Sequence, residues 1–188
     1  MLKGQNGRTR LVKILGIVSH IGSSLAENHV SEAALDRCFT RIEAWRRKNS
    51  EFQIEDDVAH LYKSGDLPLL LPDLAAANGI LISANSDSLF HLAEFAVGLQ
   101  ALESEYFSLR GKWVGVIASG DGDDHAVANQ AYQILVSCNY AGMLLPPKAF
   151  AYVKDLKGRD HLRLAIDLAD QISHYYEWEG RAASARAA

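Results

Sequence analysis

Five short apolar segments alternate with longer segments of helical period along this chain. The apolar segments lie at residues 11–18, 51–58, 79–84, 112–119 and 143–153. The first, third and fourth are continuous runs rich in β-branched residues, which is typical of strands covered on both faces. The second alternates polar and apolar positions only at its start, and two prolines interrupt the fifth. We therefore predict five strands of a parallel sheet.

The segments between and after the strands carry apolar residues at the spacing of amphipathic helices. The predicted helices span residues 25–48, 89–106, 126–139 and 161–178. The second of them is apolar nearly all round, which indicates burial against the sheet or against a second subunit. Strands that alternate with helices imply right-handed crossovers and three packed layers. The pattern predicts an α/β three-layer sandwich with strand order 2-1-3-4-5 and helices on both faces.

The composition is that of an ordinary globular protein. Of 188 residues, 48% are hydrophobic and 22% are charged, which fits one domain at 11–179 with flexible tails at 1–10 and 180–188. A net charge of -4 gives no broad attraction to nucleic acid or to an anionic membrane. No apolar run reaches the roughly 18 residues of a membrane span. We predict a cytoplasmic protein, with Cys38 and Cys138 as small buried residues.

The first strand ends in a serine-rich turn that leads into a helix. The first turn of a helix has free N–H groups, and its dipole favours negative charge. In an α/β sheet this turn lies at the carboxyl ends of the strands, where ligands usually bind. The candidate ligands of a phosphate group are Ser19, His20, Gly22, Ser23 and Ser24.

Two of these residues also have a purely structural interpretation. Ser24 and Glu27 have the spacing of a capping box, which stabilises a helix by about 1 kcal/mol without any ligand. His20 could pair with a phosphate if the phosphate raised its pKa, or it could be a solvent-facing loop residue. Both alternatives stay open at this point.

Several motifs occur together in one register. They are K-I-L-G-I-V-S-H-I-G-S-S-L at 13–25, D-L-P-L-L at 66–70, A-N-G-I-L-I-S-A-N-S at 77–86, L-R-G-K-W-V-G-V-I-A-S-G-D-G at 109–122 and G-M-L-L-P-P at 142–147. Over residues 11–150 the chain resembles the NADPH-dependent FMN reductase family, a branch of the flavodoxin-like superfamily. The resemblance implies a flavodoxin-like fold that binds FMN, takes NAD(P)H as co-substrate and passes hydride to an acceptor.

The resemblance also implies where the cofactor lies and how the chain assembles. The FMN phosphate would lie on residues 19–24, and the flavin ring would lie between two loops. The first loop holds Asn85 and Ser86, and the second holds Gly120, Asp121 and Gly122. A homodimer or higher homo-oligomer is expected, because the family usually completes its flavin pocket across a subunit interface.

The chain departs from the family pattern in ways that favour an alternative. Residues 19–24 contain no arginine or lysine, and the usual proline and tyrosine after the third strand are absent. Asp87 and the aspartates at 121–124 add negative charge near the predicted site. The alternative is a non-catalytic flavodoxin-like scaffold that has lost flavin and acts in regulation or through a protein partner.

The two ring loops also contain helix-capping residues. Ser86, Asp87 or Ser88 is predicted to cap the following helix, while Asn85 is predicted to contact the flavin. The acidic turn at 121–125 lacks the spacing of a calcium loop, and we predict that it caps the helix at 126. No set of catalytic side chains can be assembled from the sequence, so a bound flavin would carry the chemistry.

Overall fold

The computed structural model describes residues 10–21, 29–48, 52–86, 88, 89, 97, 98 and 108–186. The strands are β1 (Arg10–Ser19), β2 (Phe52–Leu61), β3 (Gly79–Asn85), β4 (Trp113–Ser119) and β5 (Phe150–Val153). The helices are α1 (His29–Arg46), the 3-10 helix η1 (Ser64–Leu70), α2 (Leu71–Ala76), α4 (Asp124–Tyr140) and α5 (Asp160–Arg186). The strands form one parallel sheet of order β2-β1-β3-β4-β5, which confirms the predicted order.

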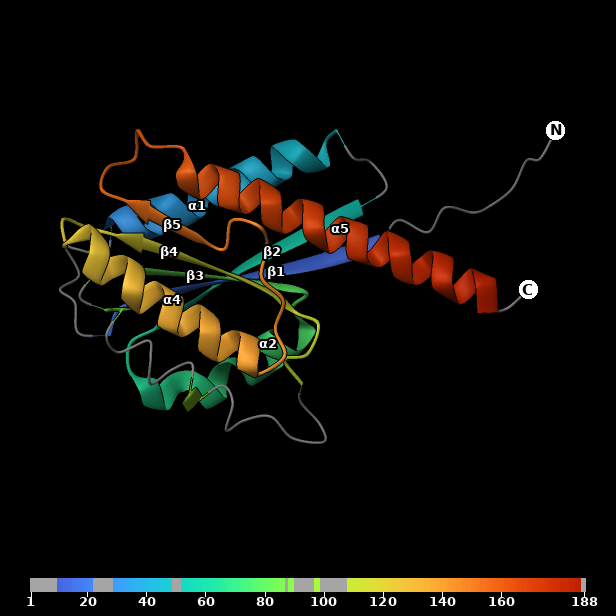
Figure 1. Cartoon of the computed structure of the whole chain (residues 1–188), viewed down its shortest axis with the longest axis horizontal. Coiled ribbons are helices and arrows are strands. Elements are labelled where there is room, and N and C mark those ends of the chain that lie inside the picture. Colours follow the sequence, from blue (N-terminus) through green and yellow to red (C-terminus); the bar gives the residue numbers. More distant parts are fainter. Residues whose placement is uncertain are drawn as a thin grey trace.

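Helices cover both faces of the sheet. In Figure 1, α1 and α5 lie above the sheet, and α2 and α4 lie below it. Every residue of β3 is buried, as are all residues of β4 after the first, because these interior strands have helices on both sides. The strands all run the same way, so their carboxyl ends and the first turns of α1, α4 and α5 gather at the left of Figure 1.

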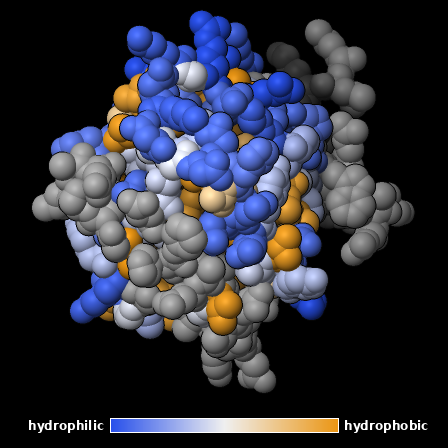
Figure 2. Space-filling view, turned by 60° about the vertical axis from the view of Figure 1, so that its left-hand side comes forward, coloured by the Kyte–Doolittle hydropathy of each residue, from blue (hydrophilic) through white to orange (hydrophobic). Residues whose placement is uncertain are grey.

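The face of the molecule shown in Figure 2 is mainly polar where the structure describes it. Figure 2 turns the left side of Figure 1 forward and shows mostly hydrophilic residues, with hydrophobic ones in small groups. Among the described residues, no helix is both long enough and apolar enough to cross a bilayer. The two cysteines are buried as predicted, and burial raises the pKa of both thiols to about 12.

Helix α1 packs directly on the backbone of β1. A Cβ atom on Gly16 would lie 2.7 Å from the side chain of Leu35 and 2.9 Å from the ring of Phe39. Glycine at this position therefore lets the helix approach the strand without a clash. The approach fixes the height of α1 above the sheet and places its first turn over the carboxyl edge.

Replacing Gly16 with alanine tests this contact. Gly16→Ala is expected to lower the free energy of unfolding by about 1–3 kcal/mol, because the added methyl overpacks a filled core. Gly65→Ala is the control, since a Cβ there meets nothing within 4 Å. Urea denaturation of both variants measures the difference. Equal decreases in the free energy of unfolding of the two variants would show that the packing of α1 does not depend on its close approach to β1 at Gly16.

Three predicted element boundaries were wrong. The second strand continues to Leu61, beyond its predicted end at 58. The fifth strand is only Phe150–Val153, and Leu144 makes an isolated bridge to Trp113, because the prolines between them cannot donate to a sheet ladder. The last helix continues to Arg186, beyond its predicted end at 178. Alanine and arginine are strong helix formers, and one interior glycine costs only about 1 kcal/mol. The predicted helix at 89–106 lies largely outside the described residues, as do residues 1–9.

His161, in the first turn of α5, is buried between the helices. Its side chain is fully inaccessible, neither ring nitrogen has a hydrogen-bond partner among the described residues, and the thiol of Cys38 donates to its backbone carbonyl. Burial lowers the pKa of His161, the charge of Arg37 lowers it further, and Asp160 partly opposes both. The fold therefore holds this imidazole in its neutral form.

The stability of the protein should consequently fall in acid. Below about pH 6.5 the unfolded chain takes up a proton at His161 that the folded chain resists, so the free energy of unfolding decreases as the pH falls toward the lowered pKa. In urea denaturation between about pH 7 and about pH 5, His161→Leu should show a shallower decrease than the wild type. His125→Gln, at an exposed position on α4, should keep the wild-type slope. If the free energy of unfolding of His161→Leu fell with pH as steeply as that of the wild type, the prediction would be wrong.

Candidate functional site

The ends of three neighbouring strands bring most of the described candidate residues together. Ser19 ends β1 beside Ala84 of β3, and Asn85 ends β3 beside Ser119 of β4. The segments that follow these strands therefore leave the sheet at one edge, as the sequence predicts. Gly22, Ser23 and Ser24 lie outside the described residues.

The two predicted ring loops contact each other directly. The amide of Ser86 donates to the carbonyl of Ser119 over 2.7 Å. Gly120 has a φ of +117°, and a Cβ atom there would lie 3.1 Å from the hydroxyl of Ser86. A Cβ atom on Gly122 would lie 3.0 Å from the Cβ of Ser86. Glycine at both positions thus leaves room for the side chain of Ser86. The sequence analysis did not predict this reason for the two glycines.

Tyr152 of β5 holds the glycine loop from the other side. Its hydroxyl lies 2.9 Å from the carbonyl oxygens of both Gly120 and Gly122, to which it donates. Partial burial raises the pKa of this tyrosine, against the opposing charge of Lys154. Tyr152 was missed in the sequence because it stands in a strand interrupted by prolines.

The edge also contains the helix caps. The side-chain oxygen of Asn85 accepts a hydrogen bond from the amide of Ser88 over 2.7 Å. The cap of the following helix by Ser86, Asp87 or Ser88 stays a prediction, because that helix lies largely outside the described residues. Asp123 caps α4 by accepting from the amide of Ala126, which confirms the predicted role of the acidic turn. Asp124 pairs with Lys154 at 2.6 Å. Asp121 is exposed.

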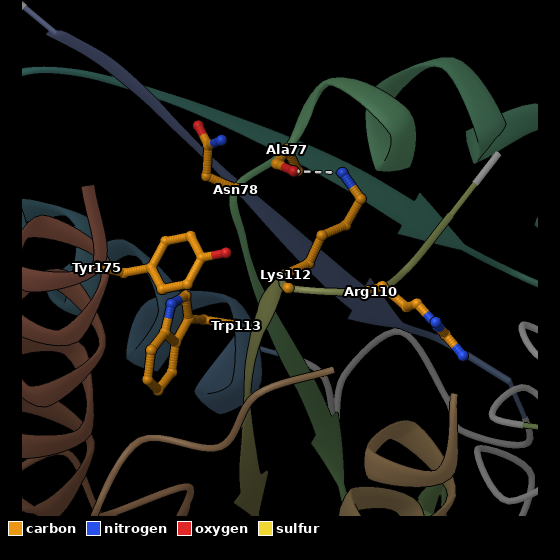
Figure 3. A pocket seen from close by; sticks show the side chains of 7 residues that line it. Ala77, Asn78, Arg110, Lys112, Trp113 and Tyr175 are labelled. Atoms are coloured by element: carbon orange, nitrogen blue, oxygen red, sulfur yellow. Dashed lines mark hydrogen bonds between the residues drawn. The ribbon is translucent and has the colours of Figure 1, made fainter. Parts of the chain in front are cut away.

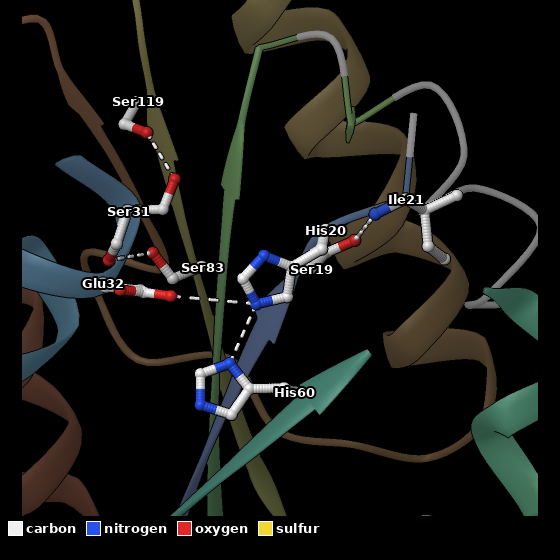
Figure 4. A network of polar contacts seen from close by, with 8 residues as sticks. All are labelled: Ser19, His20, Ile21, Ser31, Glu32, His60, Ser83 and Ser119. Atoms are coloured by element: carbon white, nitrogen blue, oxygen red, sulfur yellow. Dashed lines mark hydrogen bonds and ion pairs between the residues drawn. The ribbon is translucent and has the colours of Figure 1, made fainter. Parts of the chain in front are cut away.

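His20 is buried rather than solvent-facing, which corrects one of its two interpretations. Its side chain is 5% exposed and points toward the first turn of α1 (Figure 4). Its Nε2 lies 2.8 Å from Nδ1 of His60 and 3.8 Å from a carboxylate oxygen of Glu32. The ring of Tyr62 stacks on it with centroids 4.7 Å apart. Residue 20 continues the alternation of β1, which turns the side chain to the α1 face.

The surroundings of His20 favour a neutral imidazole. Burial lowers the pKa of His20, the neighbouring His60 lowers it further, and Glu32 partly opposes both. His60 and Glu32 were not candidates in the sequence analysis. His60 lies beyond the predicted end of the second strand at 58, and Glu32 stands in a helix where one carboxylate has no distinguishing pattern.

Buried serines attach the start of α1 to the sheet (Figure 4). The hydroxyl of Ser31 lies 2.6 Å from that of Ser119, and Ser83 donates to the backbone carbonyl of Ser31 over 2.8 Å. All three side chains are inaccessible. This network links α1 to β3 and β4 and holds the first turn of the helix in place.

A depression lies at the opposite edge of the sheet, near the starts of the strands. It encloses about 210 Å³ between the starts of β3 and β4 and the side of α5 (Figure 3). The ammonium group of Lys112 donates to the carbonyls of Ala75 and Ala77 at 2.8 and 2.7 Å, and burial lowers its pKa. This lysine therefore closes the carboxyl end of α2, which gives it a structural role.

Comparisons with known proteins identify the architecture. RosB, with a bound 8-demethyl-8-formylriboflavin-5'-phosphate intermediate, matches with a TM-score of 0.61 and 14% identity over 93% of this chain and 86% of its own. A short-chain flavodoxin associated with a bacterial microcompartment matches with a TM-score of 0.58 and 14% identity, over 87% of this chain and 98% of its own. Flavodoxin 2 from Bacillus cereus matches with a TM-score of 0.54 and 16% identity, over 85% of this chain and 99% of its own.

The chain has a flavodoxin-like fold. No protein-family model and no curated protein sequence matches it. At these identities the solved structures establish the fold and leave the activity to be argued from the site.

Replacing Tyr152 with phenylalanine tests how the glycine loop is held. Tyr152→Phe should lower the free energy of unfolding by about 1 kcal/mol, because two loop carbonyls lose their shared donor. Tyr140→Phe is the control, since Tyr140 is 84% exposed. Urea denaturation compares the two variants. If Tyr152→Phe lowered the free energy of unfolding no more than Tyr140→Phe does, the proposed role of the Tyr152 hydroxyl would be wrong.

Proposed function

We propose that the chain is an FMN-binding oxidoreductase that takes electrons from NAD(P)H and passes them to an acceptor. The observation that carries the proposal is the convergence of the segments after β1, β3 and β4 at one edge of a 2-1-3-4-5 sheet. Strand order reverses between β1 and β3, and doubly wound sheets bind ligands in the crevice at that point. The flavodoxins and RosB, which share the fold, support a flavin as the ligand.

The phosphate of FMN would bind at the turn after β1. Ser19 is inaccessible, and its hydroxyl accepts from the amide of Ile21 at 3.4 Å, which bends the chain as it leaves the strand. Residues 22–24, which lie outside the described residues, add two more hydroxyls and a glycine. Because residues 19–24 contain no basic side chain except His20, hydroxyls and amides would carry most of the binding.

The flavin ring would lie against the loops after β3 and β4. The buried hydroxyl of Ser88 has no hydrogen-bond partner among the described residues, so a polar atom of a ligand could satisfy it. Gly120 exposes backbone in a conformation that residues with a Cβ rarely adopt. Tyr152 and Ser86 hold this backbone in place, and the Asn85 side chain is committed to the Ser88 amide. Contact between Asn85 and the flavin stays a prediction.

FMN, when bound, supplies the hydride chemistry, so no side chain of this chain need act as an acid or base. The residues of the edge would orient the ring and limit the access of water.

We also propose that the protein forms a homodimer. In support, α4 presents the exposed side chains of Tyr132, Val136 and Tyr140 at a spacing of four residues, which places them along one side of the helix.

The visible absorbance of the purified protein and its titration with FMN test the proposal. We expect flavin absorbance, or saturable binding of added FMN with an increase in melting temperature. Ser19→Ala combined with Ser24→Ala should weaken FMN binding by about 10-fold, which corresponds to about 1.4 kcal/mol of lost hydrogen bonding. NADPH added without oxygen to the flavin-loaded protein should bleach the flavin band.

The matched control is Ser173→Ala. Ser173 is also a buried serine, but it bonds within α5 to the carbonyl of Ala169, so FMN affinity should not change. A colourless protein whose melting temperature does not respond to FMN would overturn the proposal and leave the flavin-free scaffold. Flavin binding without bleaching by NADPH or NADH would retain the cofactor and reject the co-substrate.

A further inference from the structure

We propose that His20, His60 and Glu32 form a binding site for a divalent cation of the zinc type. The site lies at the carboxyl ends of β1 and β2, on the α1 face of the sheet (Figure 4). It uses different side chains from the proposed flavin site, except for His20, and it does not depend on flavin binding.

The three side chains offer ligand atoms that all lie within 4.8 Å of one another. Nε2 of His20 stands 2.8 Å from Nδ1 of His60 and 3.8 Å from Oε1 of Glu32. Ligand atoms on a tetrahedral zinc ion, each about 2.0–2.2 Å from the metal, stand about 3.3–3.6 Å apart. The two observed distances bracket this value. An outward turn of the exposed His60 ring would lengthen the shorter of the two distances toward this value.

Three separate features of the fold hold these residues in place. The amide of His20 donates to the carbonyl of Leu61 at 2.8 Å, which ties the end of β1 to the end of β2. His60 pairs with Val18 in the parallel register, so the two histidines emerge on the same face. Glu32 follows Ser31, which two hydrogen bonds attach to β3 and β4. The cluster is therefore built into the sheet and the first turn of α1.

The facing ring nitrogens of His20 and His60 place a lone pair inside the cluster. Two ring nitrogens at 2.8 Å cannot both carry hydrogen, so at least one lone pair points at the other ring. Stacking of Tyr62 on His20, with an interplanar angle of 12°, fixes the orientation of the buried imidazole. A ring held in one orientation loses less conformational entropy when it binds a metal.

The donor set indicates the class of metal. Two imidazoles and one carboxylate suit Zn²⁺, Co²⁺ and Ni²⁺ better than Mg²⁺ or Ca²⁺, which prefer oxygen. Three protein ligands leave a fourth position for water or another ligand. Among the described residues, no other group of three histidine, cysteine or acidic side chains meets the same distance limit. His174 and Asp170, at 3.7 Å on α5, form only a pair.

Metal titration of the tag-free, EDTA-treated full chain tests the proposal without any flavin. Isothermal titration with Zn²⁺ should show one ion per chain, and Co²⁺ should give the visible absorbance of a four-coordinate N/O site. His60→Ala and Glu32→Gln should each weaken Zn²⁺ binding by at least about 10-fold, because each removes a ligand. Both positions are at least partly exposed, and circular dichroism with thermal melting verifies that the variants fold.

His174→Ala is the matched control, because it removes a surface histidine beside a carboxylate without touching the cluster. It should bind Zn²⁺ as the wild type does. Failure of the wild type to bind Zn²⁺ or Co²⁺ at one ion per chain would overturn the proposal. So would folded His60→Ala and Glu32→Gln variants that retain wild-type affinity. Since no flavin is added, neither result bears on the proposed FMN site.

Discussion

The close packing of α1 on β1 is the contact on which the candidate sites depend. Gly16 removes the side chain that would otherwise separate helix and strand, so that Leu35 and Phe39 rest on the backbone. At the carboxyl edge the same helix is attached through Ser31 to β3 and β4. The apolar contact sets the height of the helix and the serine network sets its position along the sheet. Together they determine where its first turn stands relative to the strand ends.

One strand end serves both proposed sites. Ser19 and His20 are consecutive, and their side chains leave β1 on opposite faces because strand residues alternate. Ser19 begins the turn that would bind the flavin phosphate, whereas His20 lies under α1 with His60 and Glu32. A cation held by that cluster would add positive charge beside a turn that has neither lysine nor arginine.

The loops after β3 and β4 are organised by contacts between them. Ser86 occupies the space above Gly120 and Gly122, and Tyr152 holds the carbonyls of both glycines. Polar groups of these loops are thus satisfied largely within the protein, so the loops would form a fixed surface for the proposed flavin ring. The unpartnered Ser88 hydroxyl is the exception among the described residues of this edge.

The sequence by itself determined the strand order and the edge of the sheet at which the candidate residues gather. Continuous apolar runs at 79–84 and 112–119 mark strands covered on both faces, and helical periodicity marks the helices at 126–139 and 161–178. It also identified the acidic turn as a helix cap, because Asp123 needs only its own neighbours to fill that role. It placed the end of α5 too early, because helix propensity is only a weak guide to where a helix stops.

Only the tertiary structure decided which side chains meet. His20 and His60 are forty residues apart, and their contact depends on the register of β1 with the edge strand β2, whose polar pattern made it the weakest prediction. Ser86 meets Gly120, and Tyr152 meets the glycine loop, only because β3, β4 and β5 lie side by side. Periodicity reports which face of an element is buried. Partners across the sheet are set by packing, which no local pattern encodes.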